Sequence, residues 1–415
     1  MKRATNGLIA IILFSILAIP PMAAKEQALI GTAKKLKNSL EGIFLDNNGG
    51  KYVAKHNSGL ELKNRKEIRI LVVPGHDKEN GGTKFRNIKE SSLNAELGEK
   101  IYDLLKNEKG FRAYLVRGRN GYFPEFLSYF NNQKTDIKRF KSAHQKAMNY
   151  YAQKGLIKDK EWVVHNSAPL DAASKLYGIN KWANENKINA VLHIHFNDYP
   201  RKNPQRRGKY SGFSIYVPEK QFSNSKESVA LAKSIFDRLR KKFAVSNMPR
   251  EKMGIIEDQK LIAIGSYNTL DSASLLIEYG YIYERQLDSP PVRELVLQRM
   301  AEQTFLGIKN FFNPEAARKK NNEEKPPRKW TKNLAEGIVG SVDVFFLQTA
   351  LSNEGLYPPG NLSKNKCPIN GNFGPCTTEA VIDFQKLYGI NPPKGRVGPL
   401  TRAKLNELYF SQKDN

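Results

Sequence analysis

The fold class is decided by the segment Ile68-Arg69-Ile70-Leu71-Val72-Val73-Pro74-Gly75-His76. Its first six residues form a short, mostly apolar run of strand length, and Pro74-Gly75 ends it. A strand that is buried on both faces gives such a continuous run rather than an alternation of apolar and polar residues. The segment therefore predicts a buried strand with His76 projecting from its end.

Strands and helices alternate after this segment. A helical pattern runs from Ser91 to Asn107, and a second strand is expected at Phe111 to Val116. Further strands are expected at Ala190 to Phe196, Gly212 to Val217 and Ser274 to Tyr279, and further helices at Ser225 to Phe243 and Pro290 to Phe312. This order predicts an α/β domain with a mixed or parallel sheet flanked by helices, and a site at strand ends.

The whole chain is long enough for two or three domains. It has 415 residues, of which 40% are hydrophobic and 26% charged, as in ordinary folded proteins. We expect the α/β domain at residues 65–313, with an insertion at about 118–188. A charged linker (314–340) and a small unit (341–410) should follow, and a leader segment (25–64) should precede the α/β domain.

The N-terminus has the pattern of an export signal. Lys2 and Arg3 precede an uncharged run whose apolar centre, Leu8 to Ile19, is 12 residues long. A helix that spans a bilayer needs about 20 residues, so we expect residues 1–24 to be a cleaved signal peptide. An uncleaved N-terminal anchor is the alternative. In either case the protein should act in the periplasm or the extracellular cell envelope.

The chain is strongly basic, with 67 Lys and Arg against 41 Asp and Glu and a formal net charge of +26. Residues 341–415 hold 8 Lys and Arg and 6 Asp and Glu, a net +2, so nearly all of the excess lies before them. Such an excess attracts an extended polyanion. Outside the cytoplasm we expect an anionic cell wall as the partner and no nucleic acid, and membrane contact only if the signal stays uncleaved.

The two cysteines, Cys367 and Cys376, lie near the C-terminus in a stretch rich in Gly, Pro and Asn. An oxidising compartment would allow them to form a disulfide. Two unrelated buried thiols are the alternative.

Polar residues at strand and helix ends suggest a metal site. His76 follows the first strand, Glu90 immediately precedes the first helix, and a period of two puts His193 and His195 on one face of a later strand. Zinc hydrolases commonly hold their metal with two His and one Glu, and leave the fourth position to water. Such a set is available here.

Glu278 completes this group, because it lies within the apolar segment Leu275 to Gly280. A carboxylate there is costly to bury unless it has a partner or a function. Next to a zinc-activated water it could act as general base and then as general acid. A lone strand His or Glu is usually structural. Four such residues in one α/β domain make a functional site as plausible as a structural role, and spacing alone does not decide between them.

The ordered motifs around these residues resemble the zinc-dependent N-acetylmuramoyl-L-alanine amidases that cleave bacterial peptidoglycan. The matching segments are Val72-Val73-Pro74-Gly75-His76, Ile88-Lys89-Glu90-Ser91-Ser92-Leu93-Asn94, Ile194-His195-Phe196-Asn197 and Leu276-Ile277-Glu278-Tyr279-Gly280-Tyr281. The resemblance covers roughly residues 66–312. It implies that His76, Glu90 and His195 bind one Zn²⁺ per chain and that Glu278 is catalytic.

Three features depart from the family pattern. Asp77 stands where the family usually has Gly, and His193 replaces the usual Ser. His193 is therefore an alternative or accessory metal ligand, or a residue that supports the ligands or faces the substrate. The insertion is longer than the family's connection, and its helical part could be a lid over the groove or extra packing.

Residues 341 to 409 resemble the small three-helix peptidoglycan-binding domain. The resemblance is carried by Val344 to Leu351, by Gly371-Asn372-Phe373-Gly374 with the following Thr377 to Gln385, and by Gly395 to Thr401. Together the two resemblances imply an exported peptidoglycan hydrolase that cleaves the amide between N-acetylmuramic acid and L-alanine by zinc-activated water. The alternatives are a zinc peptidase acting within the stem peptide and a non-catalytic cell-wall-binding protein.

Overall fold

The computed structural model describes residues 67–158, 168–314 and 326–410. The expected signal peptide (1–24) and leader segment (25–64) lie outside these ranges. Among the helices of the described residues, none has both the length and the apolar character needed to cross a membrane.

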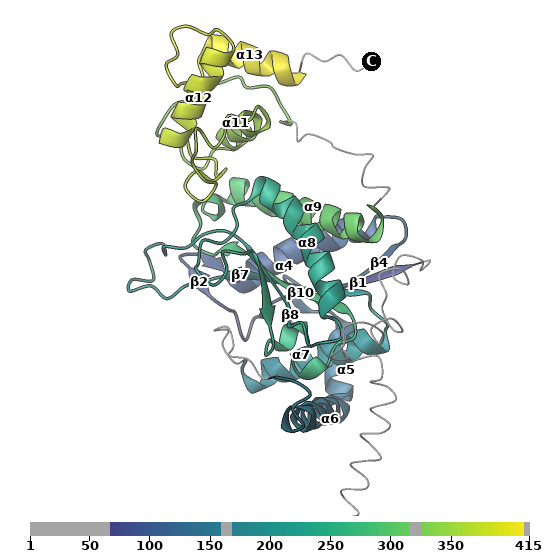
Figure 1. Cartoon of the computed structure of the whole chain (residues 1–415). Helices are drawn as coiled ribbons and strands as arrows, with labels where there is room; N and C mark the ends of the chain where they lie inside the picture. The colour runs from purple at the N-terminus through teal and green to yellow at the C-terminus, as the bar shows by residue number, and fades with distance from the viewer. Residues whose placement is uncertain (1–66, 159–167, 315–325, 411–415) are drawn as a thin grey trace, which may run out of the picture.

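A six-stranded sheet forms the centre of the larger domain (Figure 1). In spatial order the strands are β4 (Phe111–Leu115), β1 (Ile68–Pro74), β7 (Ala190–Asn197), β10 (Ala273–Tyr281), β8 (Ser214–Pro218) and β9 (Ile255–Asp258). Neighbouring strands run parallel, except that β8 is antiparallel to β10. The predicted mixed sheet is confirmed, and β9 is an addition that the sequence analysis did not include.

Helices cover both faces of this sheet, because successive strand residues point to opposite sides. On one face α4 (Glu90–Lys106), α8 (Ser225–Lys242) and α9 (Pro290–Phe312) share a core with Ile70, Leu192 and Leu275. On the other, α5 (Pro124–Asn132) and α7 (Leu170–Glu185) share a core with Leu71 and Val191. The predicted α/β class with flanking helices is therefore confirmed.

Short elements and one longer helix complete the larger domain. The short elements are β2 (Lys84–Phe85), β3 (Ile88–Lys89), β5 (Arg117–Gly118), β6 (Gly121–Tyr122), η2 (Ile262–Ile264), η3 (Ser266–Asn268) and η4 (Arg285–Leu287). The expected insertion contains α5, α6 (Lys134–Gln153) and α7. Lys175 of α7 reaches the loop after His76, since its Nζ lies 3.3 Å from carboxylate oxygens of both Asp77 and Glu79.

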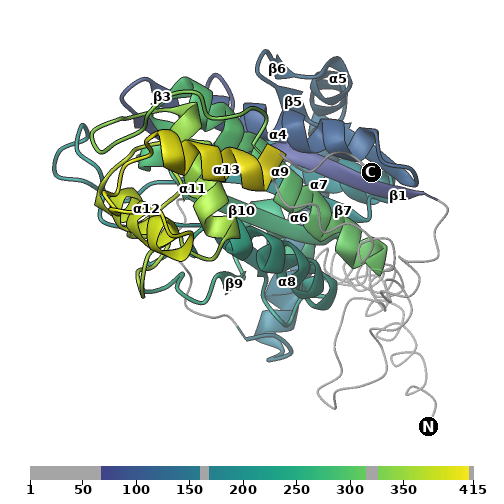
Figure 2. The same ribbon diagram turned by 90° about the horizontal axis from the view of Figure 1, so that it is seen from above.

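A small all-α unit follows, as predicted, with helices α11 (Val342–Asn353), α12 (Pro375–Leu387) and α13 (Pro399–Phe410). Cys376, the second residue of α12, forms a disulfide with Cys367. The unit packs on α9, where Arg299 donates a 2.8 Å hydrogen bond to the Thr349 hydroxyl and stacks 4.4 Å from the Phe345 ring centre. Figure 2 shows these helices from above, in front of α9 and β10.

Candidate active site

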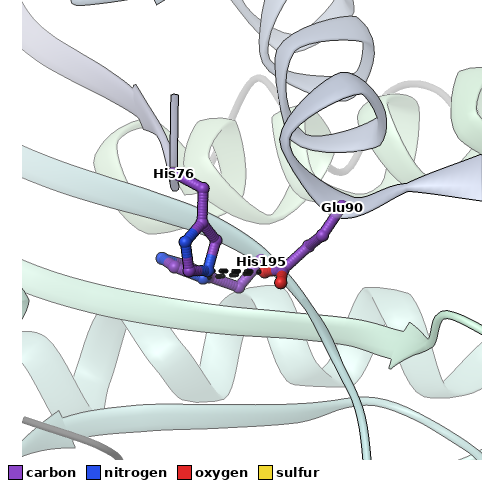
Figure 3. Close-up of side chains that lie close together, drawn as sticks. All are labelled: His76, Glu90 and His195. Carbon is purple, nitrogen blue, oxygen red and sulfur yellow. Dashed lines mark hydrogen bonds and ion pairs between the residues drawn. The ribbon is translucent and has the colours of Figure 1, made fainter. Parts of the chain in front are cut away.

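Three side chains converge where the central strands end (Figure 3). His76 follows β1, His195 lies near the end of the parallel strand β7, and Glu90 is the first residue of α4. His76 Nε2 lies 3.2 Å from Glu90 Oε1, and His195 Nδ1 lies 3.1 Å from the same oxygen. One ligand atom from each of the three residues lies within 4.8 Å of the others.

This donor set fits zinc. Two imidazole nitrogens and one carboxylate oxygen are a common ligand set of hydrolytic zinc sites, which keep a fourth position open. The Glu90 side chain is buried, whereas the His76 side chain is 32% exposed. Solvent and substrate can therefore reach the group from the His76 side.

Two glycines allow the three candidate ligands to come this close. A Cβ on Gly75 would lie 2.2 Å from the His195 ring, and one on Gly82 would lie 2.4 Å from Glu90 Oε2. Gly82 also has a φ of +69°, a conformation that side chains rarely adopt. His76 itself has a φ of 61°, which turns the chain sharply out of β1.

Buried polar groups hold the ends of β1 and α4 together. The Arg117 guanidinium donates 3.0 Å hydrogen bonds to the carbonyls of Pro74 and Ser91, and it also contacts the Gly75 carbonyl. Asn94 Nδ2 donates to the same Gly75 carbonyl at 2.9 Å. The sequence analysis missed Arg117, although a charged residue directly after an apolar strand was a usable signal.

The three residues set one another's charge states. Burial raises the pKa of Glu90, but hydrogen bonds with His195 and His76 outweigh it and hold that pKa far below its usual range. Burial lowers the pKa of His76, but its hydrogen bond and attraction to Glu90 leave that pKa raised. The pKa of His195 is lowered, because burial outweighs the effect of Glu90. An ionised carboxylate and a neutral imidazole are the forms that bind a metal.

Glu278 lies beside this group on β10, in register with His195 on β7, so both side chains project from the same face of the sheet. It is 6% exposed, and its Oε2 has no hydrogen-bond partner in the described part of the chain. Burial raises the pKa of Glu278 well above its usual range, and the charges of Glu90 and Glu251 raise it further. The carboxyl group is therefore suited to hold a proton.

Glu251 is a second buried carboxylate near the site, and the sequence analysis missed it. It accepts hydrogen bonds from the Ser246 hydroxyl (2.6 Å), the Tyr216 hydroxyl (2.7 Å), Asn197 Nδ2 (2.9 Å) and the Tyr281 hydroxyl (3.1 Å). These donors come from different strands and loops, so no local pattern marked Glu251 as special.

His193 lies outside the group of three. It is fully buried, and it is in register with Val73 and Leu276, deeper in the sheet than His195. Neither ring nitrogen has a hydrogen-bond partner among the described residues. Burial, together with the charge of His195, lowers the pKa of His193 to about 3, so the ring is neutral at physiological pH.

The fold and the site define an α/β protein with a candidate metal centre of the kind that metal-dependent hydrolases use. The N-acetylmuramoyl-L-alanine amidase family model matches residues 70–310, more than half of the chain, so the chain belongs to this family. A peptidoglycan binding domain model matches residues 340–405. The protein is accordingly an N-acetylmuramoyl-L-alanine amidase, a peptidoglycan hydrolase that acts in the cell envelope or outside the cell.

Several solved amidases are similar to this chain at low identity. One from Clostridium difficile 630 has 15% identity and a TM-score of 0.37, covering 60% of this chain and 100% of its own. Ami1 from Mycobacterium smegmatis has 15% identity and a TM-score of 0.39, covering 60% and 98%. The catalytic domain of CwlV from Bacillus (Paenibacillus) polymyxa has 14% identity and a TM-score of 0.37, covering 59% and 98%. No curated protein sequence matches significantly.

Proposed function

We propose that His76, Glu90 and His195 hold one Zn²⁺ and that Glu278 moves the proton during amide hydrolysis. The observation that carries this proposal is the convergence of three donor atoms within 4.8 Å. The buried carboxylate of Glu278, with one oxygen free of hydrogen bonds among the described residues, supports its role. When bound, Zn²⁺ supplies a Lewis acid that polarises the carbonyl and acidifies water.

The side chains of the protein supply the remaining steps. Glu278 takes a proton from the attacking water while the water oxygen bonds to the lactyl carbonyl carbon of N-acetylmuramic acid. It then passes this proton to the nitrogen of L-alanine as the C–N bond breaks. Glu278 must be ionised to take the proton, and the raised pKa then favours holding that proton until the nitrogen leaves.

We also propose that the protein reaches its substrate by export through residues 1–24 and that the C-terminal domain holds it there. A linked binding domain raises the local concentration of enzyme at an insoluble polymer without a new catalytic contact. The basic charge before residue 341 adds attraction to an anionic wall, which salt weakens.

Two measurements test these proposals. The purified protein should hold about one zinc per chain, keep it in His193→Ala and lose it in Glu90→Ala. The opposite result for these variants would overturn the ligand assignment. Mass spectrometry of peptidoglycan digested by the protein should detect free stem peptides that begin at L-alanine. Shorter peptide fragments would instead indicate a peptidase, and no cleavage by the zinc-loaded protein would indicate a wall-binding protein.

A further inference from the structure

A cavity of about 260 Å³ lies between the two domains, away from the three candidate ligands. The larger domain contributes the loop 207–212, residues 242–244 and residues 283–286 to its wall. The C-terminal domain contributes Ser352, residues 357–358 and the segment 364–369. The cavity therefore exists only when both domains are in place.

Direct hydrogen bonds hold the C-terminal wall of this cavity on the larger domain. Lys364 Nζ donates to the carbonyls of Arg240 (2.6 Å) and Lys241 (2.7 Å). Asn365 Nδ2 donates to the carbonyls of Ser211 and Val245, each at 3.1 Å. The disulfide at Cys367 ties the same segment to α12.

The lining is strongly positive. It includes six cationic side chains, namely Arg207, Lys209, Lys242, Arg285, Lys364 and Lys366. The one carboxylate in the lining belongs to Glu284, and it already accepts hydrogen bonds from the backbone of Gly212 and Tyr281, each at 2.8 Å, and from Gln286 at 3.0 Å. This carboxylate is therefore committed to the local backbone and is poorly placed to neutralise the lysines.

Two of these lysines have no acidic partner in the described part of the chain. Arg207 pairs with Asp288, but within the described residues neither Lys209 nor Lys366 forms an ion pair with a carboxylate. Burial lowers the pKa of Lys364, and the charges of Lys242 and Arg240 lower it further. A bound anion would relieve this repulsion, and charge-assisted hydrogen bonds would hold it.

We propose that this interdomain cavity binds a free carboxylate of the peptidoglycan stem peptide, through Lys209 of the larger domain and Lys366 of the C-terminal domain. The proposal rests on peptidoglycan as the substrate, because both flanking domains belong to families that act on or bind it. The acidic residues and the terminal alanine of stem peptides carry free carboxylates. The volume is below the roughly 300 to 1,000 Å³ of pockets for drug-sized ligands, so a peptide end fits better than a disaccharide.

The chain links this cavity to the candidate active site. The loop that carries Arg207 and Lys209 begins directly after β7, the strand of His195. Asp198, at the start of the loop, accepts a hydrogen bond from Thr83, and Thr83 N donates to Glu90 at 3.0 Å. A peptide held in the cavity would thus contact the loop after β7, which is hydrogen-bonded through Thr83 to the candidate ligand Glu90.

The test uses the full-length protein and the free tetrapeptide L-Ala-γ-D-Glu-meso-diaminopimelate-D-Ala, titrated by calorimetry at low salt. The test variant is Lys209→Gln/Lys366→Gln, since both side chains are exposed. The control is Lys226→Gln/Lys394→Gln, which removes the same charge from exposed positions, one in each domain, away from the cavity.

We expect the test variant to bind the tetrapeptide about tenfold more weakly, and the control to stay within about twofold of the wild type. A tetrapeptide with amidated carboxyl groups should bind the wild type as weakly as the free peptide binds the test variant. Equal binding by both variants would refute the proposal. Displacement by an equal concentration of inorganic phosphate would also refute it, because the cavity would then select phosphate over carboxylate.

These outcomes are separate from those of the amidase reaction. The tetrapeptide is a reaction product, so its binding is measured without turnover. If the zinc-loaded wild type fails to release stem peptides from peptidoglycan, the proposed chemistry is wrong whatever the calorimetry shows. If it releases them while the tetrapeptide binds both variants alike, only the carboxylate site is wrong.

Discussion

Replacing Gly82 by alanine should weaken metal binding by moving one ligand. An alanine Cβ at this position would lie 2.4 Å from Glu90 Oε2 and 2.7 Å from His76 Cδ2. Because Cβ contacts under 3.0 Å essentially never occur, the carboxylate or the loop must shift by at least 0.6 Å (3.0 − 2.4). Gly82 also has a φ of +69°, where an alanine is strained.

The size of the effect follows from the tolerance of metal sites. Metal–ligand distances vary by only about 0.2 Å, so the required shift of 0.6 Å is about three times larger. Loss of a contact that orients a ligand typically costs 10- to 100-fold in metal affinity, and we expect a loss of about that size. Alanine in the left-handed region should also cost about 1 to 2 kcal/mol of folding stability.

Zinc affinity is measured by competition with a chromophoric chelator, and stability by urea unfolding of the metal-free protein. Gly81→Ala is a matched control, because a Cβ at Gly81 would have no neighbour closer than 3.8 Å and its φ is not in the left-handed region. The control should bind zinc as the wild type does. A folded Gly82→Ala protein with wild-type zinc affinity would refute the placement of the metal between His76 and Glu90.

Three further predictions concern other parts of the protein. Glu278→Gln should keep about one zinc per chain, while its turnover of peptidoglycan falls roughly 10²- to 10⁴-fold. The control Glu257→Gln, at an exposed position, should stay active. Unchanged turnover in Glu278→Gln would show that Glu278 is structural. The pKa of His193 is about 3 in the folded protein and 6.5 for an unperturbed histidine, as in the unfolded chain, so stability is lost as the pH falls below 6.5. By pH 4.5 this loss of unfolding free energy is on the order of 2 to 3 kcal/mol. Urea titrations of the metal-free protein should detect it in the wild type, and His193→Leu should not show this loss. Reduction of the Cys367–Cys376 disulfide should destabilise the C-terminal domain by about 2 to 3 kcal/mol, which calorimetry of oxidised and reduced protein would detect; identical melting curves would contradict this.

Sequence patterns predicted the elements that carry strong periodicity. β1, β7 and β10 are apolar runs buried on both faces, and α8 and α9 have long amphipathic patterns, so each was found close to its observed bounds. β9 is four residues long at the sheet edge, where Ile255 and Glu257 are not buried, and it gives no comparable run. Its pairing with β8 is a tertiary contact that a local pattern does not encode.

The candidate ligands were predictable because each sits in a short motif at the end of a strong element. The residues that position them were not, because their roles arise from contacts distant in sequence. Arg117 bonds to the carbonyl of Pro74, 43 residues earlier, and Glu251 accepts a hydrogen bond from Asn197, 54 residues earlier. Only the folded chain brings these groups together.

Glu251 and Glu278 are two buried carboxyl groups with different surroundings. Glu251 accepts four hydrogen bonds, which compensate for the loss of water around its charge. Glu278 has an oxygen without a partner in the described chain, and the charge of Glu251 adds to the burial that raises its pKa. Hydrogen bonds stabilise the negative charge of Glu251, and this charge repels a negative charge on Glu278. The protonated form of Glu278 is therefore favoured. In the mechanism proposed above, the network around Glu251 would therefore help Glu278 to hold the proton that is delivered to the leaving nitrogen.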